Sequence, residues 1–179
     1  MSKKVLIISS SPHKDGNSET LCQQFALGAT EAGHEVETLF LRNYRINYCF
    51  GCDRCQETGR CVQKDDAALL LDKMLAADVI VLATPVYFYS MSAQLKTLID
   101  RTVPIYTKLE NKEFYFITTA ADTEPENMER VIDALRGFTE LCLTNPMEKG
   151  VLCALGIWKP GEIKKTKYMA QALAMGAGC

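Results

Sequence analysis

Short apolar runs alternate with amphipathic stretches along the whole chain. The β-branched run Val5-Leu6-Ile7-Ile8 and the uniformly apolar run Val79-Ile80-Val81-Leu82-Ala83 are typical of strands buried in a sheet. Between these runs, apolar residues recur at helical spacing from Leu21 and stop at Gly33, a common helix terminator. By the same criteria we predict strands at 5–8, 35–40, 79–83, 114–118 and 150–155, and helices at about 21–33, 67–77, 92–101, 128–141 and 162–175.

Strand and helix alternate five times, which predicts a parallel sheet with helices on both faces. The fold class is therefore α/β, and its natural five-strand form is the flavodoxin-like three-layer αβα sandwich with strand order 2-1-3-4-5. The chain has no internal repeat or linker, so we expect one domain over 1–179, with a cysteine-rich loop at about 41–64. Ligands of such sheets bind beyond the carboxyl ends of the strands, so the loops after the first four strands should meet at one edge.

The charge and hydropathy of the sequence limit the compartments in which the protein is expected and the partners that it could bind. Lysine and arginine number 20 against 22 acidic residues, and the net charge of −2 leaves no basic footprint for nucleic acid. The apolar run at 5–8 is shorter than the roughly 7–15 residues of a signal-peptide core, and no run approaches the roughly 20 residues of a membrane span. We therefore expect a cytoplasmic protein with no membrane or nucleic-acid partner. Thiols stay reduced there, so clustered cysteines favour metal or redox chemistry.

The loop after the first strand is rich in hydroxyl and amide groups. A helix N-terminus offers free backbone N–H groups and a partial positive charge, which suits a phosphate. The loop has neither a Walker Gly-Lys-Ser/Thr nor a G-x-G-x-x-G pattern, so it fits a terminal phosphate monoester, as on FMN, better than a triphosphate or a dinucleotide. The alternative is a plain strand-to-helix turn with Ser and Asn caps. The candidate donors are Ser9, Ser10, Ser11, Asn17, Ser18 and Thr20.

Three adjacent aromatic residues follow the buried strand at 79–83, in the expected loop Thr84-Pro85-Val86-Tyr87-Phe88-Tyr89-Ser90. Aromatic rings and backbone amides suit the face and edges of a flat ring system. The short stretch 118–121, after the fourth strand, is placed to form the opposite wall of the same slot. The alternative is that one or two of the aromatic side chains pack beneath the next helix.

Four of the eight cysteines fall within thirteen positions, in the pattern C-x2-C-x2-C-x5-C. Four thiolates on a short loop can hold a [4Fe–4S] cluster, with one cysteine to each iron. Zinc and redox-active thiols are the alternatives, but zinc sites usually use two C-x2-C pairs held well apart, so this spacing favours a cluster. The candidate ligands are Cys49, Cys52, Cys55 and Cys61. Asp65-Asp66 is expected to cap the helix from 67, and Cys22, Cys142 and Cys153 are expected in the core.

Six short motifs occur in order along the chain: Ser10-Ser11-Pro12, Gly16-Asn17-Ser18, Ala77-Asp78-Val79-Ile80-Val81, Thr84-Pro85-Val86-Tyr87, Leu95-Lys96 and Ile99-Asp100-Arg101. Together they resemble the NADPH-dependent FMN reductase family, and more narrowly its iron–sulfur flavoproteins. The resemblance covers about the first 120 residues and continues more loosely to the end. The chain departs from the family at Ser10, where the family usually has glycine.

The resemblance implies a flavodoxin-like fold, non-covalently bound FMN and assembly into a homodimer or homotetramer. It also implies a [4Fe–4S] cluster on the cysteine loop, because the iron–sulfur flavoproteins carry a compact C-x2-C-x2-C-x4–7-C motif, which this loop fits. By the resemblance, the FMN phosphate is held by Ser11, Asn17, Ser18 and Thr20, the ring is bordered by Pro85, Val86, Tyr87 and Phe88 with Thr119 beyond it, and the cluster is bound by Cys49, Cys52, Cys55 and Cys61. From the residues of the first loop, Ser9 joins the candidates for the cofactor site.

No Ser-His-Asp, Cys-His or paired-carboxylate constellation stands out, so the chemistry is expected to come from cofactors. The main hypothesis is an FMN-dependent oxidoreductase, or electron-transfer flavoprotein, that relays electrons between a [4Fe–4S] cluster and FMN. Its donor would be NAD(P)H or a ferredoxin-like protein, and its acceptor a small molecule or an oxygen species. One alternative is an NAD(P)H-dependent FMN or quinone reductase without a cluster. The other is a non-enzymatic flavodoxin-like binding protein switched by a metal or by thiols.

Overall fold

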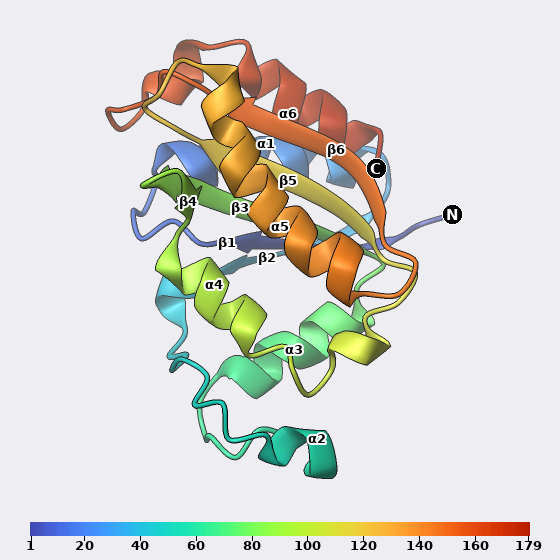
Figure 1. The fold of residues 1–179 in the computed structure, drawn as a ribbon. Helices are drawn as coiled ribbons and strands as arrows, with labels where there is room; N and C mark the ends of the chain where they lie inside the picture. The colour runs from blue at the N-terminus through green and yellow to red at the C-terminus, as the bar shows by residue number, and fades with distance from the viewer.

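A parallel sheet forms the middle layer of the molecule (Figure 1). The computed structural model describes the whole chain, Met1–Cys179. The parallel strands follow the order β2-β1-β3-β5-β6, which is the predicted order 2-1-3-4-5 when these five are counted along the chain. The predicted α/β fold class is therefore confirmed. The strands are β1 (Lys4–Ser9), β2 (Glu35–Phe40), β3 (Val79–Tyr87), β5 (Glu113–Thr119) and β6 (Met147–Ala154).

A sixth strand, β4 (Ser90–Met91), was not predicted. The expected loop after 79–83 is instead a continuation of β3 to Tyr87, followed by a tight turn and an antiparallel return in which Val86 pairs with Met91. The two turn residues, Phe88 and Tyr89, have φ angles of 49° and 60°, as both central residues of a type I′ hairpin turn must. Pairing with β5 carries the strand past Ala83 to Pro85, opposite Thr119, and pairing with β4 adds Val86 and Tyr87.

Helices cover both faces of the sheet, as predicted (Figure 1). One face carries α1 (Asn17–Glu31) and α6 (Tyr168–Ala177), and the other carries α3 (Ala67–Ala76), α4 (Ala93–Asp100) and α5 (Glu129–Cys142). Short 3-10 turns occupy Leu41–Asn43, Tyr106–Lys108, Pro125–Met128 and Glu162–Lys165. None of the helices combines the length and the apolar character needed to cross a membrane.

The last helix begins later than predicted. The sequence pattern predicts a helix from 162, but Glu162–Lys165 forms a separate 3-10 turn, and α6 starts at Tyr168. Thr166 lies between them in an extended conformation, and its hydroxyl accepts a hydrogen bond from the backbone N–H of Tyr168 at 3.3 Å. This threonine therefore ends one helical segment and caps the next.

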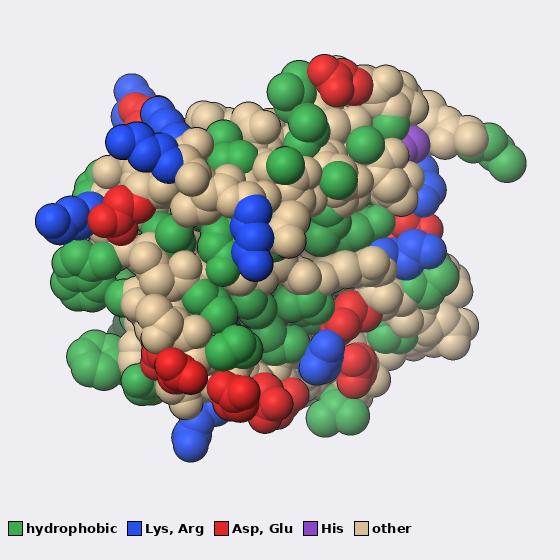
Figure 2. Space-filling model, turned by 90° about the horizontal axis from the view of Figure 1, so that it is seen from above, with side chains coloured by type: hydrophobic (Ala, Val, Ile, Leu, Met, Phe, Trp, Pro, Cys, Tyr) green, Lys and Arg blue, Asp and Glu red, His purple; other side chains and the backbone are tan.

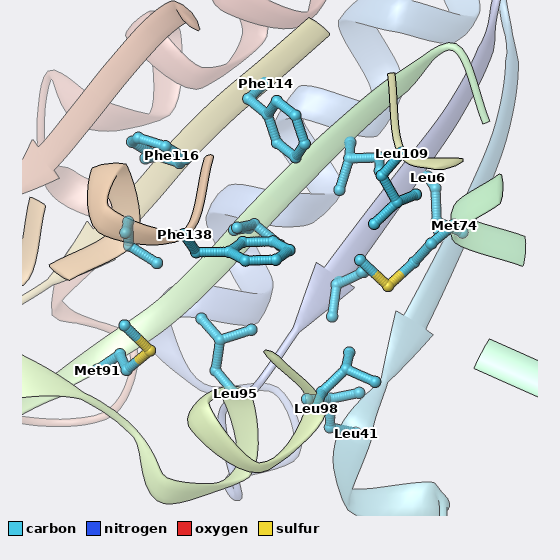
Figure 3. Close-up of a cluster of buried hydrophobic side chains, with 14 of the residues drawn as sticks. Leu6, Leu41, Met74, Met91, Leu95, Leu98, Leu109, Phe114, Phe116 and Phe138 are labelled. Carbon is cyan, nitrogen blue, oxygen red and sulfur yellow. The ribbon is translucent and has the colours of Figure 1, made fainter. Parts of the chain in front are cut away.

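The central strands bury side chains on both faces, which explains their uninterrupted apolar sequence. Along β1, Leu6 and Ile8 join the core beneath α3, α4 and α5, whereas Val5 and Ile7 join the core beneath α1 and α6. Figure 3 shows the first of these cores, in which Phe138 of α5 lies among side chains from the sheet and from α4. Strands β1 and β3 are thus fixed at the centre of the sheet.

Helices α1 and α6 pack with their backbones in direct contact. A Cβ atom on Gly28 would overlap the carbonyl oxygen of Leu173, and a Cβ atom on Gly176 would overlap that of Phe25. Glycine is therefore required at both positions by the close approach of the two helices, not by the backbone conformation. This contact supports α1, whose N-terminus forms part of the site described below.

The cysteine-rich segment projects from the body of the protein, beyond α3 and α4 (Figure 1). It contains one short helix that was not predicted, α2 (Arg54–Thr58), which has no buried residue. Figure 2 shows another face of the molecule. Hydrophobic side chains gather across its middle, with a basic side chain among them, and charges of both signs are scattered toward its edges.

Candidate functional site

A cavity of about 400 Å³ opens at the carboxyl edge of the sheet, near the β3–β4 hairpin (Figure 1). It is bounded by the loop after β1, the ends of β3 and β5, and the loop after β6. The predicted meeting of loops at one edge is therefore observed for three of the four loops. Seven of the ten predicted FMN-binding residues line the cavity, namely Ser11, Asn17, Ser18, Pro85, Val86, Tyr87 and Thr119.

The N-terminus of α1 forms one end of this cavity. The backbone N–H groups of Asn17, Ser18 and Glu19 have no acceptor within the chain. Gly16, just before the helix, allows the loop to pack tightly, because a Cβ there would lie 3.1 Å from the Cβ of His13. The unpaired N–H groups and the partial positive charge of the helix end match the needs of a phosphate.

Two hydroxyl groups complete this end of the cavity. The buried Ser18 hydroxyl bonds the Thr119 hydroxyl at 2.7 Å, which joins the first turn of α1 to the end of β5. The Ser11 hydroxyl accepts a hydrogen bond from the backbone N–H of His13 at 3.2 Å, so its own proton is available to a ligand. His13 and Gly16 line the cavity as well and were absent from the predicted site.

The side chain of Asn17 is already engaged by another loop. Its Nδ2 donates to the Lys159 carbonyl at 2.9 Å, and its Oδ1 accepts from the N–H groups of Gly161 and Ile163 at 3.0 and 3.4 Å. Asn17 therefore offers a phosphate its backbone N–H rather than its side-chain amide. Its amide fixes the loop after β6 instead.

That loop supplies a wall of the cavity that the sequence pattern did not indicate. Ile157, Trp158 and Pro160 line the cavity, and the backbone N–H groups of Trp158 and Lys159 both donate to Glu162 Oε2 at 2.8 Å. The exposed Trp158 ring therefore stands at the rim on a loop with fixed geometry.

The other walls come from the ends of β3 and β5. Pro85 pairs with Thr119 of β5, and Val86 and Tyr87 pair with β4, so the backbone of this wall is held on both sides. Tyr87 is 42% exposed and Trp158 is 78% exposed, and both rings border the opening. Apolar walls with a few backbone groups between them are typical of a pocket for a flat heterocycle.

Three predicted residues lie outside the cavity. Ser9 is fully buried at the end of β1, beside Cys22 and beneath α1, and its hydroxyl has no hydrogen-bond partner. The Thr20 hydroxyl donates to the Gly16 carbonyl at 3.0 Å, so it supports the loop from behind. Phe88 is fully exposed at the tip of the hairpin.

The departure from the family at Ser10 leaves the turn intact. Ser10 is buried without a positive φ, so nothing in its conformation demands glycine. Its hydroxyl donates to the Ala83 carbonyl at 3.0 Å and accepts from the Ser92 hydroxyl at 2.9 Å. Ser92 caps α4, so its bond to Ser10 couples the phosphate end of the cavity to that helix.

A larger cavity, of about 580 Å³, lies between the cysteine loop, α4 and α5. Its lining is mostly apolar, and its charged side chains are one lysine, Lys96, and one carboxylate, Asp100. The smaller cavity is our candidate for the mononucleotide site, because the unpaired N–H groups of α1 lie there. Cys49 and Cys142 both reach the larger one. The expectation that Cys142 is a core residue is wrong, because it lies exposed in the last turn of α5, whereas Cys22 is buried as expected.

The four cysteines of the loop are free thiols, of which Cys49 and Cys52 are exposed and Cys55 and Cys61 half-buried. The pKa of Cys55 is raised, chiefly by burial, with a smaller contribution from each of the other three cysteines. No three Cys, His, Asp or Glu side chains are close enough to form a metal site. The four thiols thus lie on one loop in an open arrangement.

The fold and the cavity define a class: a flavodoxin-like α/β protein with a cavity at the carboxyl edge of its sheet. The chain belongs to the NADPH-dependent FMN reductase family, whose model matches residues 3–140. An iron-sulfur flavoprotein of Methanocaldococcus jannaschii is 43% identical over 102 residues, which are 57% of this chain and 53% of that protein. An iron-sulfur flavoprotein of Methanosarcina thermophila is 39% identical over 112 residues, 61% of this chain and 59% of that protein.

Solved structures support the same fold. An NAD(P)H:quinone oxidoreductase from Methanothermobacter marburgensis superposes with a TM-score of 0.75 over 99% of this chain and 96% of that one. The sequence identity is 18%, so this similarity establishes the architecture alone. The matches to the first three curated relatives span about half the length of each of those proteins.

Proposed function

We propose that this protein is an FMN-dependent oxidoreductase whose cysteine loop carries a [4Fe–4S] cluster. The observation that carries the proposal is the cavity at the carboxyl edge, with unpaired helix N–H groups at one end and exposed aromatic rings at its opening. Its volume falls in the roughly 300–1,000 Å³ range of small-molecule pockets. Membership in an FMN reductase family supports the identity of the ligand.

In this proposal the phosphate of FMN lies at the first turn of α1. It accepts hydrogen bonds from the N–H groups of Asn17 and Ser18 and from the hydroxyls of Ser11 and Ser18. Thr20 supports the loop from behind through its bond to the Gly16 carbonyl, and Ser9 lies buried outside the cavity. The flavin ring lies against Pro85, Val86 and Tyr87, with Thr119 on the far side and Phe88 at the outer edge.

Cys49, Cys52, Cys55 and Cys61 are proposed to hold the cluster. Four thiols on one loop are the donor set that a cubane needs, and the names of several relatives include iron and sulfur. When bound, the cluster would supply one-electron chemistry and FMN two-electron chemistry. The chain's own residues would then position the two groups and leave the ring edge open at Tyr87 and Trp158.

The donor in this proposal is NAD(P)H or a ferredoxin-like protein. The acceptor is a quinone-type small molecule or an oxygen species. We also propose a homodimer or homotetramer as the functional assembly, in keeping with the resemblance to the family.

A second function is favoured by specific observations: an NAD(P)H-dependent FMN or quinone reductase without a cluster. The thiols do not form a closed metal site, and the matching family model is described as NADPH-dependent. In that case hydride passes from the nicotinamide to FMN directly, and the cysteines serve another purpose. A thiol-switched binding protein is the remaining alternative.

Anaerobic purification followed by a visible spectrum and an iron and sulfide assay separates these functions. We expect FMN with about four iron and four sulfide per wild-type chain. Cys55→Ala should lose the iron and keep the FMN, because the phosphate and ring contacts lie on other loops. The matched control is Cys142→Ala, which removes an exposed cysteine outside the loop and should keep both cofactors.

The other outcomes assign the function differently. FMN without iron in the wild-type protein, with rapid bleaching by NADPH alone, would establish the second function. Absence of FMN binding under every condition would leave the thiol-switched binding protein.

A further inference from the structure

One buried ion pair holds both ends of the cysteine loop. Arg101, directly after α4, donates through Nη1 to the Asn47 carbonyl at 2.7 Å, before the first cysteine. It also forms a two-pronged bond with Asp65, after the last cysteine, with Nη1–Oδ2 at 2.7 Å and Nη2–Oδ1 at 2.9 Å. A single guanidinium therefore closes the segment 47–65 at its base.

The carboxylate of Asp65 reinforces this closure. It accepts hydrogen bonds from the backbone N–H of Asn47 at 2.9 Å and of Ala67 at 3.2 Å, so it joins the start of the loop to the start of α3. The Arg101 and Asp65 side chains are each 1% exposed, in contrast to the open loop that they close. The bidentate geometry of the pair thus fixes the two ends of the loop relative to each other.

Both partners are charged in the folded protein. The hydrogen bond from Arg101 is the largest influence on the pKa of Asp65 and lowers it. Burial alone would lower the pKa of Arg101, but the bond and the charge of Asp65 outweigh burial and raise it. The pair is therefore ionic.

Arg101 also reaches one of the proposed cluster ligands. Its Nη2, which already bonds Asp65, donates to Cys61 Sγ at 3.4 Å. At the other end of α4, the Ser92 cap bonds Ser10 behind the phosphate loop. One helix thus connects the wall of the mononucleotide cavity with the base of the cysteine loop.

We propose that Arg101 is a positioning residue, which keeps the base of the cysteine loop closed so that the loop can gather its four cysteines around a cluster, and which donates a hydrogen bond to Cys61 Sγ. The inference rests on the proposed function, because it assigns a role toward the cluster. Hydrogen bonds to ligating sulfur and nearby positive charge raise the reduction potential of such clusters, so this donor would raise it. Lysine cannot replace it, since one ammonium lacks the planar fork that serves Asn47, Asp65 and Cys61 together.

The test compares Arg101→Lys with wild-type protein after anaerobic reconstitution with iron and sulfide. We expect Arg101→Lys to keep its FMN, to lose most of its iron and sulfide, and to show a lower midpoint potential for the cluster that remains. In metal-free protein, backbone hydrogen exchange over 47–65 should become faster in the variant and stay unchanged in the sheet. That readout requires no cluster.

Two further variants keep the test decisive. Arg136→Lys alters a comparable two-pronged pair, with Glu148 at 2.8 and 2.8 Å, that lies outside the loop; its iron content, potential and loop exchange should match wild type. If Arg101→Lys does not fold, the double variant Arg101→Met/Asp65→Leu replaces the whole pair with apolar side chains, which preserves folding in comparable cases. It should keep FMN and lose the cluster.

A failure of the proposed cluster and a failure of the proposed role of Arg101 would give different results. A wild-type protein that takes up no iron would refute the cluster, and faster loop exchange in Arg101→Lys would then still establish the anchor. Wild-type iron content and potential in a folded Arg101→Lys protein would overturn the role of Arg101. Equal losses in Arg136→Lys would overturn it as well.

Discussion

The mononucleotide cavity and the cysteine loop are built in opposite ways. The cavity is formed where β1, β3 and β5 end, and its polar groups are joined by short hydrogen bonds between buried side chains such as Ser18 and Thr119. The loop lies largely in solvent and is closed at its base by one ion pair. A cofactor site can therefore be made from a sheet edge or from an exposed segment with a buried anchor, and substitutions in the two should have different effects.

The largest effect is expected at the anchor of the loop. Arg101→Leu leaves the Asp65 carboxylate buried without its partner, which should lower the free energy of unfolding by about 3–5 kcal/mol. Urea denaturation followed by circular dichroism measures the change. The control, Arg136→Leu, removes a partly exposed arginine and should cost no more than about 1 kcal/mol. Equal losses in the two variants would show that the buried pair stabilises the protein no more than the partly exposed pair does.

The next effect concerns the scaffold beneath the cavity. Gly176→Ala forces α6 away from α1, because the new Cβ would overlap the Phe25 carbonyl, and should lower the free energy of unfolding by about 1–3 kcal/mol. Gly137→Ala in α5 is the matched control, since a Cβ there meets nothing within 4 Å. The control should be stabilised by up to about 1 kcal/mol, because alanine favours a helix over glycine. Thermal denaturation of both variants tests the sign of each change.

A smaller effect is expected inside the cavity. Ser18→Ala removes the hydroxyl that bonds Thr119 and, in our proposal, the phosphate, so FMN affinity should fall about five- to tenfold, or about 1 kcal/mol. Quenching of FMN fluorescence measures the affinity, and the iron content should not change. The control is Thr30→Ala, at the other end of α1, where the hydroxyl bonds only the Ala26 carbonyl. An unchanged affinity in Ser18→Ala would remove that hydroxyl from the proposed phosphate site.

The smallest effect concerns the free energy of unfolding at low pH, which depends on the charge of Asp65 in the anchor. The pKa of Asp65 is lowered in the folded protein by its bond to Arg101, so the resulting stability is fully present above the ordinary Asp range near pH 4. It is lost as the pH falls below 4 toward the lowered value. Urea midpoints measured from pH 7 to pH 3 should fall more steeply for wild type than for Arg101→Met/Asp65→Leu. Parallel curves would show that Asp65 titrates normally.

Much of the scaffold could be predicted from the sequence because it depends on local patterns. The uninterrupted apolar runs identified β1 and β3 as central strands, and β2 was predicted with the bounds it has. The predicted bounds were wrong where pairing with another strand extended an element, as for β3, which continues because β5 and β4 pair with it. The start of α6 also depended on one threonine, whose bond to Tyr168 no periodicity indicates.

For the site, the sequence by itself determined the chemistry: a hydroxyl-rich loop before a helix, an aromatic segment after a buried strand, and four closely spaced cysteines. Only the tertiary structure decided which groups are available. Asn17, expected at the phosphate, is bonded to Gly161, 144 residues away, and Asp65, expected to cap the next helix, bonds Arg101, 36 residues away, as well. Periodicity and motif spacing record what is near in the chain. A hydrogen bond between distant segments depends on how the layers pack, and that is decided only by the folded molecule.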